Sequence, residues 1–197
     1  MRLVLATTNP GKIREIRHVL DGAGIELRTL ADYPPIAEPD ETGTTFSENA
    51  RLKGLYYAAH TGELTVAEDS GLVIDGLDGQ PGVSSARYLG ASATYADRFA
   101  HIFSELDARQ QRDSAARFIC ALSLARGARI LFEAEGRVEG RIASGPRGTN
   151  GFGYDPIFFY PPYGCTLAEV DHDRKLAVAH RGHAFRQLRE YLSRHVD

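Results

Sequence analysis

Cysteine is scarce in this sequence, with two residues, Cys120 and Cys165, among 197. Neither belongs to a CxxC pair, which argues against a zinc site built on cysteine and against a framework of disulfides. Cys120 lies in the apolar segment RFICALSL and is expected in the core, whereas Cys165 lies in YGCT, which is typical of a turn. Such sparse use of cysteine indicates a reduced, cytoplasmic protein.

Long apolar runs and an excess of positive charge are also absent. No run approaches the roughly 18 residues of a membrane span, and LVLA at residues 3–6 is too short for the apolar core of a signal peptide. The net charge is −3, which favours neither nucleic acid nor an anionic membrane as a partner. An anionic ligand would therefore have to be bound by a local basic site.

Internal repeats, low-complexity segments and a clear interdomain linker are missing too. A composition of 43% hydrophobic and 25% charged residues is that of an ordinary globular protein. A chain of this length can bury roughly 70% of its unfolded surface without a disulfide. We therefore expect residues 1–197 to form a single domain, with room for two lobes.

What the sequence does contain is an alternation of strand-like and helix-like segments. Helix starts are indicated by Asn9 with Pro10, and by Thr45 with Glu48 as a capping box. The expected strands are residues 2–7, 25–30, two apolar runs within 64–75, 115–125, 128–138 and 157–160. The expected helices are residues 10–20, 45–60, 94–106 and the C-terminal segment. This alternation predicts an α/β protein, and the hairpin-like pair of strands predicts a mixed sheet.

The turn TTNPGK at residues 7–12 joins the first strand to the first helix. The free N–H groups of a helix start, together with the charge of Lys12, suit a phosphate or a carboxylate. However, the phosphate-loop spacing GxxxxGK[ST] is absent, and an Asn-Pro helix cap with a solvated lysine explains the same residues. The turn by itself leaves both interpretations open.

Three polar residues, Glu68, Asp69 and Ser70, follow an apolar run. We expect them to end a strand at the carboxyl edge of the sheet, where open α/β sheets bind ligands. Adjacent carboxylates repel each other, and Mg²⁺ with its retained waters would relieve that repulsion. Glu38, Asp40 and Glu41 in the proline-rich acidic loop could complete a metal site if the loop folds back. An acidic turn and a solvated loop are the alternatives.

Glycines cluster in GTNGFGYDP at residues 148–156. Glycine lets a backbone approach a flat ligand closely, and Phe152 or Tyr154 could stack on a base. Asp155 could accept a hydrogen bond from a ligand N–H. A tight turn with core aromatics explains the segment equally well.

The C-terminal segment DRKLAVAHRGH contains Lys175, His180, Arg181 and His183. In one continuous helix Lys175 and Arg181 would point about 120° apart. Both could reach one ligand only if the helix breaks, which we expect near His180. The spacing of His180 and His183 would suit a metal pair, but no third ligand for zinc is evident.

Six segments, taken together and in this order, form a pattern that is specific for one protein family. They are ATTNPGKIREI, FSENARLKG, AEDSGL, GQPGVSSARY, GFGYDPIFF and HRGHA. They resemble the inosine-triphosphate pyrophosphatase family, from residue 3 to about residue 190, and GFGYDPIFF is the most specific of them. The resemblance implies an elongated α/β fold with two lobes around a mixed central sheet. It also implies an active-site cleft between the lobes and a homodimer.

The resemblance also implies an activity: Mg²⁺-dependent hydrolysis of dITP, ITP and XTP to the monophosphate and pyrophosphate, which cleanses the nucleotide pool. Asp69 would be the general base, and Glu41, Glu68 and Asp69 would bind Mg²⁺. The residues that would bind the substrate are Thr7, Thr8, Asn9, Pro10, Gly11, Lys12, Lys53, Ser70, Phe152, Gly153, Tyr154, Asp155, Lys175, His180 and Arg181. Among these, the turn and Lys53 would neutralise the triphosphate.

The chain departs from the family's pattern at three places. The family commonly has DDSG where this chain has Glu68 before Asp69, and the longer glutamate could shift the metal. The family also has TGN where this chain has Thr8 between Thr7 and Asn9. Asp40 and Glu41 are adjacent, so in an extended segment only one of them reaches a metal, and we choose Glu41.

We expect the protein to select the nucleobase of its substrate by whether position 6 of the base accepts or donates a hydrogen bond. Hypoxanthine and xanthine present a 6-keto acceptor where adenine presents a donor, so a donor near His180 and Arg181 would favour the first two bases. This reasoning does not explain how guanine is rejected.

Two other functions are open on the sequence: a related pyrophosphatase acting on standard or modified pyrimidine nucleotides, and a nucleotide- or RNA-binding module without catalysis. The acidic residues argue against the second, because without a metal they would repel a polyanion.

Overall fold

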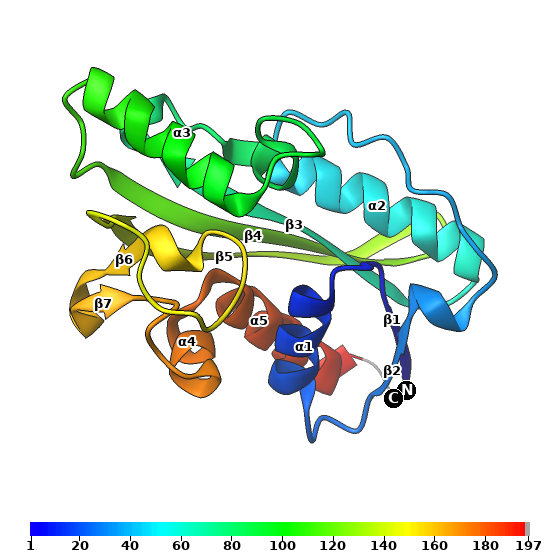
Figure 1. Cartoon of the computed structure of the whole chain (residues 1–197). Coiled ribbons are helices and arrows are strands. Elements are labelled where there is room, and N and C mark those ends of the chain that lie inside the picture. Colours follow the sequence, from blue (N-terminus) through cyan, green and yellow to red (C-terminus); the bar gives the residue numbers. More distant parts are fainter. Residues whose placement is uncertain (196–197) are drawn as a thin grey trace. The chain divides into compact units, whose positions relative to one another are not determined.

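The computed structural model describes residues 1–195 and forms an α/β fold around a seven-stranded sheet (Figure 1). Its strands are β1 (Arg2–Leu5), β2 (Glu26–Thr29), β3 (Thr65–Ile74), β4 (Ala115–Arg126), β5 (Arg129–Ile142), β6 (Phe158–Tyr160) and β7 (Cys165–Thr166). Its helices are α1 (Pro10–Leu20), α2 (Phe46–Thr61), α3 (Tyr95–Ala108), α4 (His172–Val178) and α5 (His180–His195). The expected fold class is confirmed. Within residues 1–195, no helix is both long enough and apolar enough to cross a membrane.

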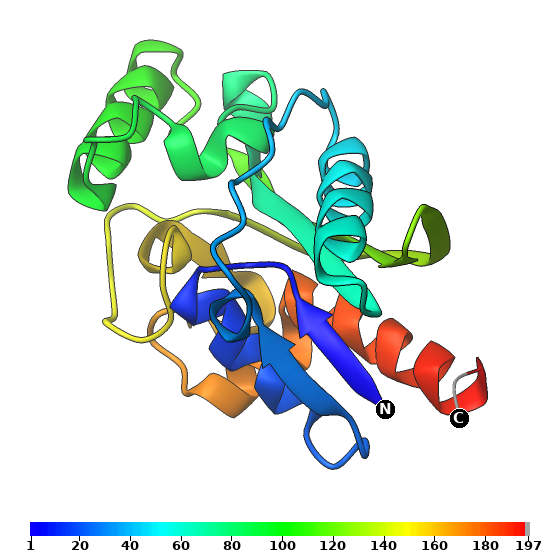
Figure 2. The same cartoon turned by 90° about the vertical axis from the view of Figure 1, so that its right-hand side faces the viewer.

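The strands follow the order β2-β1-β3-β4-β5-β6-β7. β1 is parallel to both β2 and β3, whereas β6 is antiparallel to both β5 and β7, so the sheet is mixed, as the sequence predicts. Figure 2 shows β1 and β2 side by side. Only Gly127 and Ala128 separate β4 from β5, and a two-residue connection permits only an antiparallel hairpin. Gly127 has φ +57°, in the left-handed region that favours glycine.

Internal contacts divide the chain into two compact units. The first unit comprises residues 1–70 and 120–136 and the segment that begins at His180. The second unit comprises residues 71–119 and 137–179. Because β3, β4 and β5 each contain one of these boundaries, each long strand contributes residues to both units.

The first unit contains α1, α2 and α5, and α1 packs directly on α5 (Figure 1). On α1, Ile16, Val19 and Leu20 recur at helical spacing and are buried. On α5, Phe185 and Leu188 are buried in the same way. Both helices therefore bury an apolar stripe, and this fixes which of their polar residues face inward.

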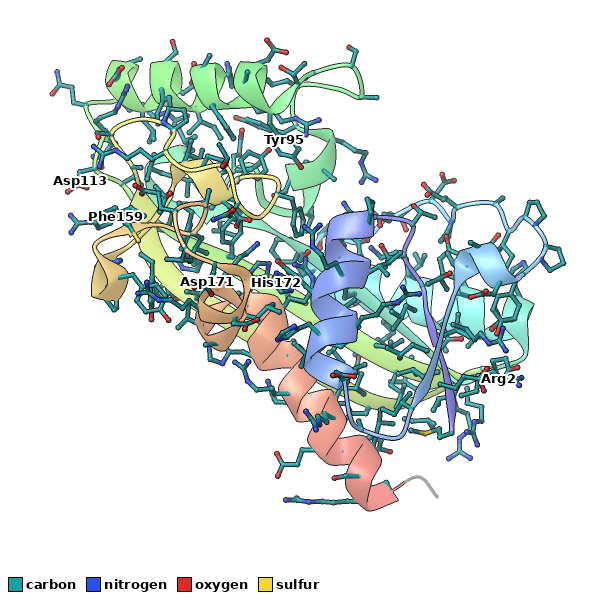
Figure 3. The ribbon with its side chains drawn as sticks, turned by 60° about the horizontal axis from the view of Figure 1, so that its bottom comes forward. Arg2, Tyr95, Asp113, Phe159, Asp171 and His172 are labelled. Atoms are coloured by element: carbon teal, nitrogen blue, oxygen red, sulfur yellow. The ribbon has the colours of Figure 1, made fainter. Side chains whose placement is uncertain are left out.

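The second unit has an apolar core of its own. Its members are Leu72, Ile74, Leu77, Phe99, Ile102, Leu106, Ala116, Phe118, Val138, Ile142, Tyr154, Ile157, Phe158 and Leu167. The expected helix at 94–106 is α3, which Thr94 caps in a reciprocal capping box with Asp97. Figure 3 shows Tyr95 at the start of this helix. Its ring meets the buried ring of Tyr154 edge-on, with 5.3 Å between the centroids.

The helix starts predicted from the sequence are confirmed. Asn9 Oδ1 accepts the N–H groups of Gly11 and Lys12 at 2.9 and 3.2 Å and so caps α1. The capping box of Thr45 opens α2. The expected C-terminal helix is two helices, because Ala179 between α4 and α5 is extended, with ψ 148°. The break expected near His180 is therefore confirmed.

The expectation that Glu68, Asp69 and Ser70 end a strand is wrong, because β3 continues through them to Ile74. They nevertheless lie beyond the carboxyl end of β1, whose last residue Leu5 pairs with Val66. A local excess of negative charge suggests a turn, but cations from distant parts of the chain neutralise these acids. Cys165 also differs from the expectation, since it belongs to β7 rather than to a turn.

Candidate active site

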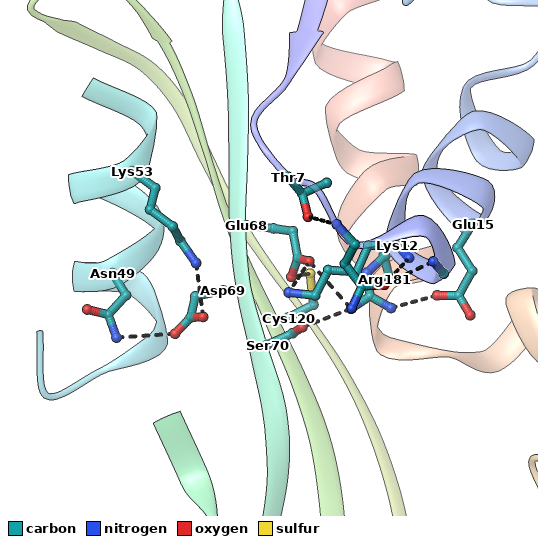
Figure 4. Close-up of polar contacts among 12 residues, drawn as sticks. Thr7, Lys12, Glu15, Asn49, Lys53, Glu68, Asp69, Ser70, Cys120 and Arg181 are labelled. Carbon is teal, nitrogen blue, oxygen red and sulfur yellow. Dashed lines mark hydrogen bonds and ion pairs between the residues drawn. The ribbon is translucent and has the colours of Figure 1, made fainter. Parts of the chain in front are cut away.

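The two acids of β3 lie on opposite faces of the sheet, because adjacent side chains of a strand alternate. Glu68 points toward Lys12 of α1 and Arg181 of α5, whereas Asp69 points toward α2 (Figure 4). All of these residues belong to the first unit. We call Lys12, Glu15, Glu68, Ser70, Cys120 and Arg181 the Glu68 cluster. We call Glu41, Asn49, Lys53 and Asp69 the Asp69 cluster.

The Glu68 carboxylate is buried and is bound by two cations. Lys12 Nζ lies 2.7 Å from Glu68 Oε1, and Arg181 Nη2 lies 3.5 Å from the same oxygen. Burial raises the pKa of Glu68, but the charges of Lys12 and Arg181 outweigh it and hold this pKa well below its usual value. Glu68 is therefore an anion at neutral pH and anchors both cations.

Arg181 is held from two further directions. Its Nη1 donates to Glu15 Oε2 at 2.6 Å, and its Nη2 donates to Ser70 Oγ at 2.8 Å. Burial lowers the pKa of Arg181, but Glu68 and Glu15 outweigh it and the pKa ends above its usual value. A planar guanidinium with several partners keeps one orientation, so Arg181 is fixed between α1 and β3.

Cys120 is a core residue of β4, as the sequence predicts. Its Sγ lies 3.5 Å from Glu68 Oε2, within reach of a weak S–H hydrogen bond. Burial raises the pKa of the Cys120 thiol well above its usual value, so the thiol keeps its proton and can act as the donor.

The turn at 7–12 is a helix cap, as one of the two interpretations left open by the sequence requires. Asn9 caps the helix, and its own N–H donates to Thr7 Oγ1 at 3.2 Å. Lys12 is not a solvated lysine, because Glu68 binds it. Thr8 and Pro10 are exposed. The turn therefore combines a helix cap with a lysine that pairs with a buried carboxylate.

The Asp69 cluster is built around the ammonium of Lys53. Lys53 Nζ lies 2.6 Å from Glu41 Oε1 and 3.1 Å from Asp69 Oδ1. Asn49 Nδ2 donates to the other oxygen, Asp69 Oδ2, at 3.2 Å. Burial raises the pKa of Asp69, and although Lys53 lowers it, the net effect is a pKa above the usual value. Burial lowers the pKa of Lys53, but Asp69 and Glu41 outweigh it.

The model of the Ham1 family matches residues 3–191 of this sequence. The chain belongs to the Ham1 family. A dITP/XTP pyrophosphatase from Exiguobacterium sp. is 46% identical over 95% of each chain, and one from Gloeobacter violaceus is 46% identical over 98% of this chain and 94% of its own. The solved structure of a HAM1 protein from Coxiella burnetii covers 98% of this chain and 99% of its own, with 39% identity and a TM-score of 0.91. The family resemblance inferred from the six segments is confirmed.

The residues of the Asp69 cluster fit a hard divalent cation in this Ham1 protein. Oxygens of Glu41 and Asp69 converge on one positive charge, the Lys53 ammonium. Mg²⁺ needs only one or two protein carboxylates beside its waters and phosphate oxygens, so this pair is sufficient. Glu68 is turned to the other face of β3 (Figure 4). Over residues 1–195, no group of three Asp, Glu, His or Cys residues is placed to hold a metal ion.

Of the other predicted residues of this Ham1 protein, His180 is buried in the first unit, and those of the glycine-rich segment and Lys175 lie in the second unit. Lys175 Nζ donates to Asp155 Oδ2 at 2.5 Å and lies 4.7 Å from the centroid of the Phe152 ring. Asp155 Oδ2 also accepts the Phe152 N–H at 2.8 Å. Gly151 has φ +73°, and a Cβ there would lie 2.1 Å from Asp155 Oδ2, so only glycine fits.

The aromatic side chains of the glycine-rich segment have different environments. Tyr154 is buried in the core, and its hydroxyl donates to the Ser85 carbonyl at 2.8 Å. This is the core alternative that the sequence left open. Phe152 is half-buried over Lys175. Gly153 has φ +66° and connects these two aromatic residues.

Sequence reasoning missed three residues of the site: Glu15, Asn49 and Cys120. Glu15 directly precedes Ile16 on the buried stripe of α1, and an acid on an apolar stripe is a signal for a buried cation. Asn49 lies four residues before Lys53 and therefore on the same face of α2. Cys120 offers no such signal, because a cysteine in an apolar strand reads as core.

Proposed function

We propose that this protein hydrolyses dITP, ITP and XTP to the nucleoside monophosphate and pyrophosphate. The observation that carries the proposal is the placement of Lys12 and Lys53 against adjacent carboxylates of one strand, Glu68 and Asp69. Phosphoryl transfer mostly requires positioning and neutralisation of charge, and this arrangement supplies two cations for it. The names of the similar proteins, dITP/XTP pyrophosphatases, support the substrate class.

Asp69 is the residue best suited to accept a proton from the attacking water. Its pKa is raised, whereas that of Glu68 is lowered, so Asp69 is the more basic of the two. A general base is most effective when its pKa approaches the working pH. Glu41 and Asp69 would hold Mg²⁺, which when bound would neutralise phosphate charge and acidify a water. Lys53 would then be released to bind a phosphate oxygen.

Recognition of the base is the second part of the proposal. Arg181 is a hydrogen-bond donor whose orientation is fixed by Glu15 and Ser70. The residue before it, His180, is also buried. A fixed donor can donate a hydrogen bond to a 6-keto oxygen, whereas the 6-amino group of adenine would be left without an acceptor, and this difference can discriminate strongly. Phe152, Asp155 and Lys175 are proposed as nucleotide-binding residues on the family resemblance. A homodimer and a cytoplasmic location are proposed on the same basis.

The proposal is tested by a substrate panel with detection of pyrophosphate. ITP, XTP, dITP, ATP, GTP and the pyrimidine triphosphates are compared with and without Mg²⁺. We expect turnover of the first three with Mg²⁺, release of pyrophosphate, and loss of turnover in EDTA. Preference for a pyrimidine nucleotide would support the related pyrophosphatase, and binding without turnover would support a nucleotide-binding module. Equal rates with ATP and ITP would contradict the proposed specificity.

A further inference from the structure

Asn49 is buried in the Asp69 cluster, and both ends of its amide have a partner. Its Nδ2 donates to Asp69 Oδ2 at 3.2 Å, and its Oδ1 accepts the Gly43 N–H at 2.8 Å. The Gly43 N–H can only donate, so the amide oxygen must face it. The amide NH₂ then faces Asp69, and the amide cannot be flipped without losing both bonds.

Gly43 brings the acidic loop directly onto the start of α2. A Cβ at Gly43 would lie 2.6 Å from Asn49 Oδ1 and 2.7 Å from Glu48 Cβ, which leaves no room for any side chain. Gly43 lies two residues after Glu41, whose carboxylate contacts Lys53 at 2.6 Å. The hydrogen bond from Gly43 to Asn49 therefore ties the segment that carries Glu41 to the helix that carries Lys53.

Asp69 is held by two residues of a single helix. Asn49 and Lys53 are four residues apart and share a face of α2. Asn49 contacts Oδ2 of Asp69, and Lys53 contacts Oδ1 at 3.1 Å. The capping box between Thr45 and Glu48 defines where this helix begins, and hence the register of both contacts. The plane of the Asp69 carboxylate is thus set by α2, with Oδ1 on the side of Glu41.

We propose that Asn49 is a positioning residue of the reaction. It orients the Asp69 carboxylate through Nδ2 and holds the Glu41 segment in place through Oδ1. Asn49 acts through other groups: through the Asp69 carboxylate, to which it donates, and through the backbone of Gly43, which it holds. The inference rests on the proposed function, since it assigns Asn49 to the same site.

The test is Asn49→Ala, measured by steady-state kinetics with ITP and by binding of Mn²⁺ in the absence of nucleotide. Partners that orient a metal-binding or catalytic side chain typically contribute about 10- to 100-fold. We expect kcat to fall by about this factor while KM for ITP changes little, because the substrate contacts remain. We also expect Mn²⁺ to bind about 10-fold more weakly, as measured by electron paramagnetic resonance.

Two further variants separate positioning from a loss of folding. Gly43→Ala keeps the Asn49 amide but displaces it, and we expect the same pattern of low kcat and weak Mn²⁺ binding. Ser114→Ala is the matched control, because it removes a buried side-chain acceptor for another glycine N–H, that of Gly76 at 2.8 Å, within the second unit. We expect this control to lower the Tm without changing kcat or Mn²⁺ binding.

The possible outcomes distinguish this inference from the proposed function. If the wild type hydrolyses ITP and both variants keep wild-type kcat and Mn²⁺ binding, Asn49 has no positioning role and the function is unaffected. A loss confined to KM, or one that the Ser114→Ala control reproduces, would also overturn the inference. Absence of turnover in the wild type itself would instead contradict the proposed function. If Asn49→Ala fails to fold, Gly43→Ala decides the question.

Discussion

Glu68 and Asp69 are neighbours in one strand, yet their environments shift their pKa values in opposite directions. Both are buried, so desolvation acts on both. Glu68 contacts two cations, Lys12 and Arg181, whereas Asp69 shares the cation Lys53 with Glu41. Burial raises both pKa values, and the comparison teaches that the cations on each face determine whether that rise persists, as it does for Asp69, or is reversed, as it is for Glu68.

The two faces also differ in what can approach them. The side chain of Glu68 is 1% exposed, whereas those of Asp69 and Glu41 are 8% and 19% exposed. On the Glu68 face the partly exposed group is the cation Lys12, at 19%, whereas on the Asp69 face both carboxylates are partly exposed. We infer that the Asp69 face accepts the proton and that Lys12 neutralises phosphate charge from the Glu68 face, a difference that mutations can test.

The largest effect should come from Asp69→Asn. The amide cannot accept a proton, so we expect kcat with ITP to fall by about 10²- to 10⁴-fold, the usual contribution of a general base. The Tm should not fall, because the substitution removes a desolvated charge and Lys53 keeps Glu41 as its partner. Thermal unfolding and kinetics on the same preparation check both points. Full activity would remove Asp69 from the mechanism.

Glu68→Gln should instead act on stability. It removes the carboxylate shared by Lys12 and Arg181, and breaking a buried ion pair typically costs about 3–5 kcal/mol. Glu15 still neutralises Arg181 in part, so the protein should fold. Urea denaturation measures the change in the free energy of unfolding. If Glu68→Gln lowered the free energy of unfolding no more than Asp69→Asn does, the two faces would contribute equally to stability.

Lys12→Ala tests whether a cation of the Glu68 cluster also serves the substrate. Removal of one charged group that stabilises the transition state typically costs about 10²- to 10³-fold, and we expect kcat/KM with ITP to fall by about 10²-fold. Stability should change less than in Glu68→Gln, because Arg181 still contacts the carboxylate. An unchanged kcat/KM would confine Lys12 to a structural role.

The smallest effects are expected where α2 packs on β4. Ser123 is buried, and within the described residues its hydroxyl has no hydrogen-bond partner. Ser123→Ala should therefore stabilise the protein by about 1 kcal/mol, since an unsatisfied buried polar group is costly.

Gly54→Ala sharpens this last test. The new Cβ would lie 3.3 Å from both Ser123 Oγ and Ser123 O, which offsets the roughly 1 kcal/mol that alanine gains over glycine in a helix. Removing the hydroxyl relieves one of these contacts, so Gly54→Ala should stabilise more in the Ser123→Ala background than alone. Chemical denaturation of the four proteins measures this coupling, and strict additivity would contradict the contact.

Features that depend on neighbours in sequence could be predicted. Asn9 and Thr45 cap the helices that follow them, because each cap bonds to backbone N–H groups two or three residues away. The alternation of apolar segments was likewise sufficient for the α/β class and for the β4–β5 hairpin. The break before α5 followed from the separation that one helix would impose on Lys175 and Arg181.

Features that depend on distant residues could not be predicted. The course of β3 through Glu68 depends on Arg181, which is more than 100 positions away, and on Lys12. No local pattern shows that these charges will meet. The opposite orientation of Glu68 and Asp69 could have been inferred from strand alternation, had the strand been expected to continue. The hydrogen bond between Asn49 and Gly43 could not have been inferred, because the acidic loop has no periodic pattern that would place Gly43 against α2.

Neither unit of the molecule corresponds to one stretch of the gene. The chain crosses from one unit to the other within β3, β4 and β5 and again after Ala179. The first unit includes both α1 and α5, so a ribosome must synthesise the whole of the second unit before the first unit has all of its parts. For the same reason, a single recombination event could not exchange either unit between two genes.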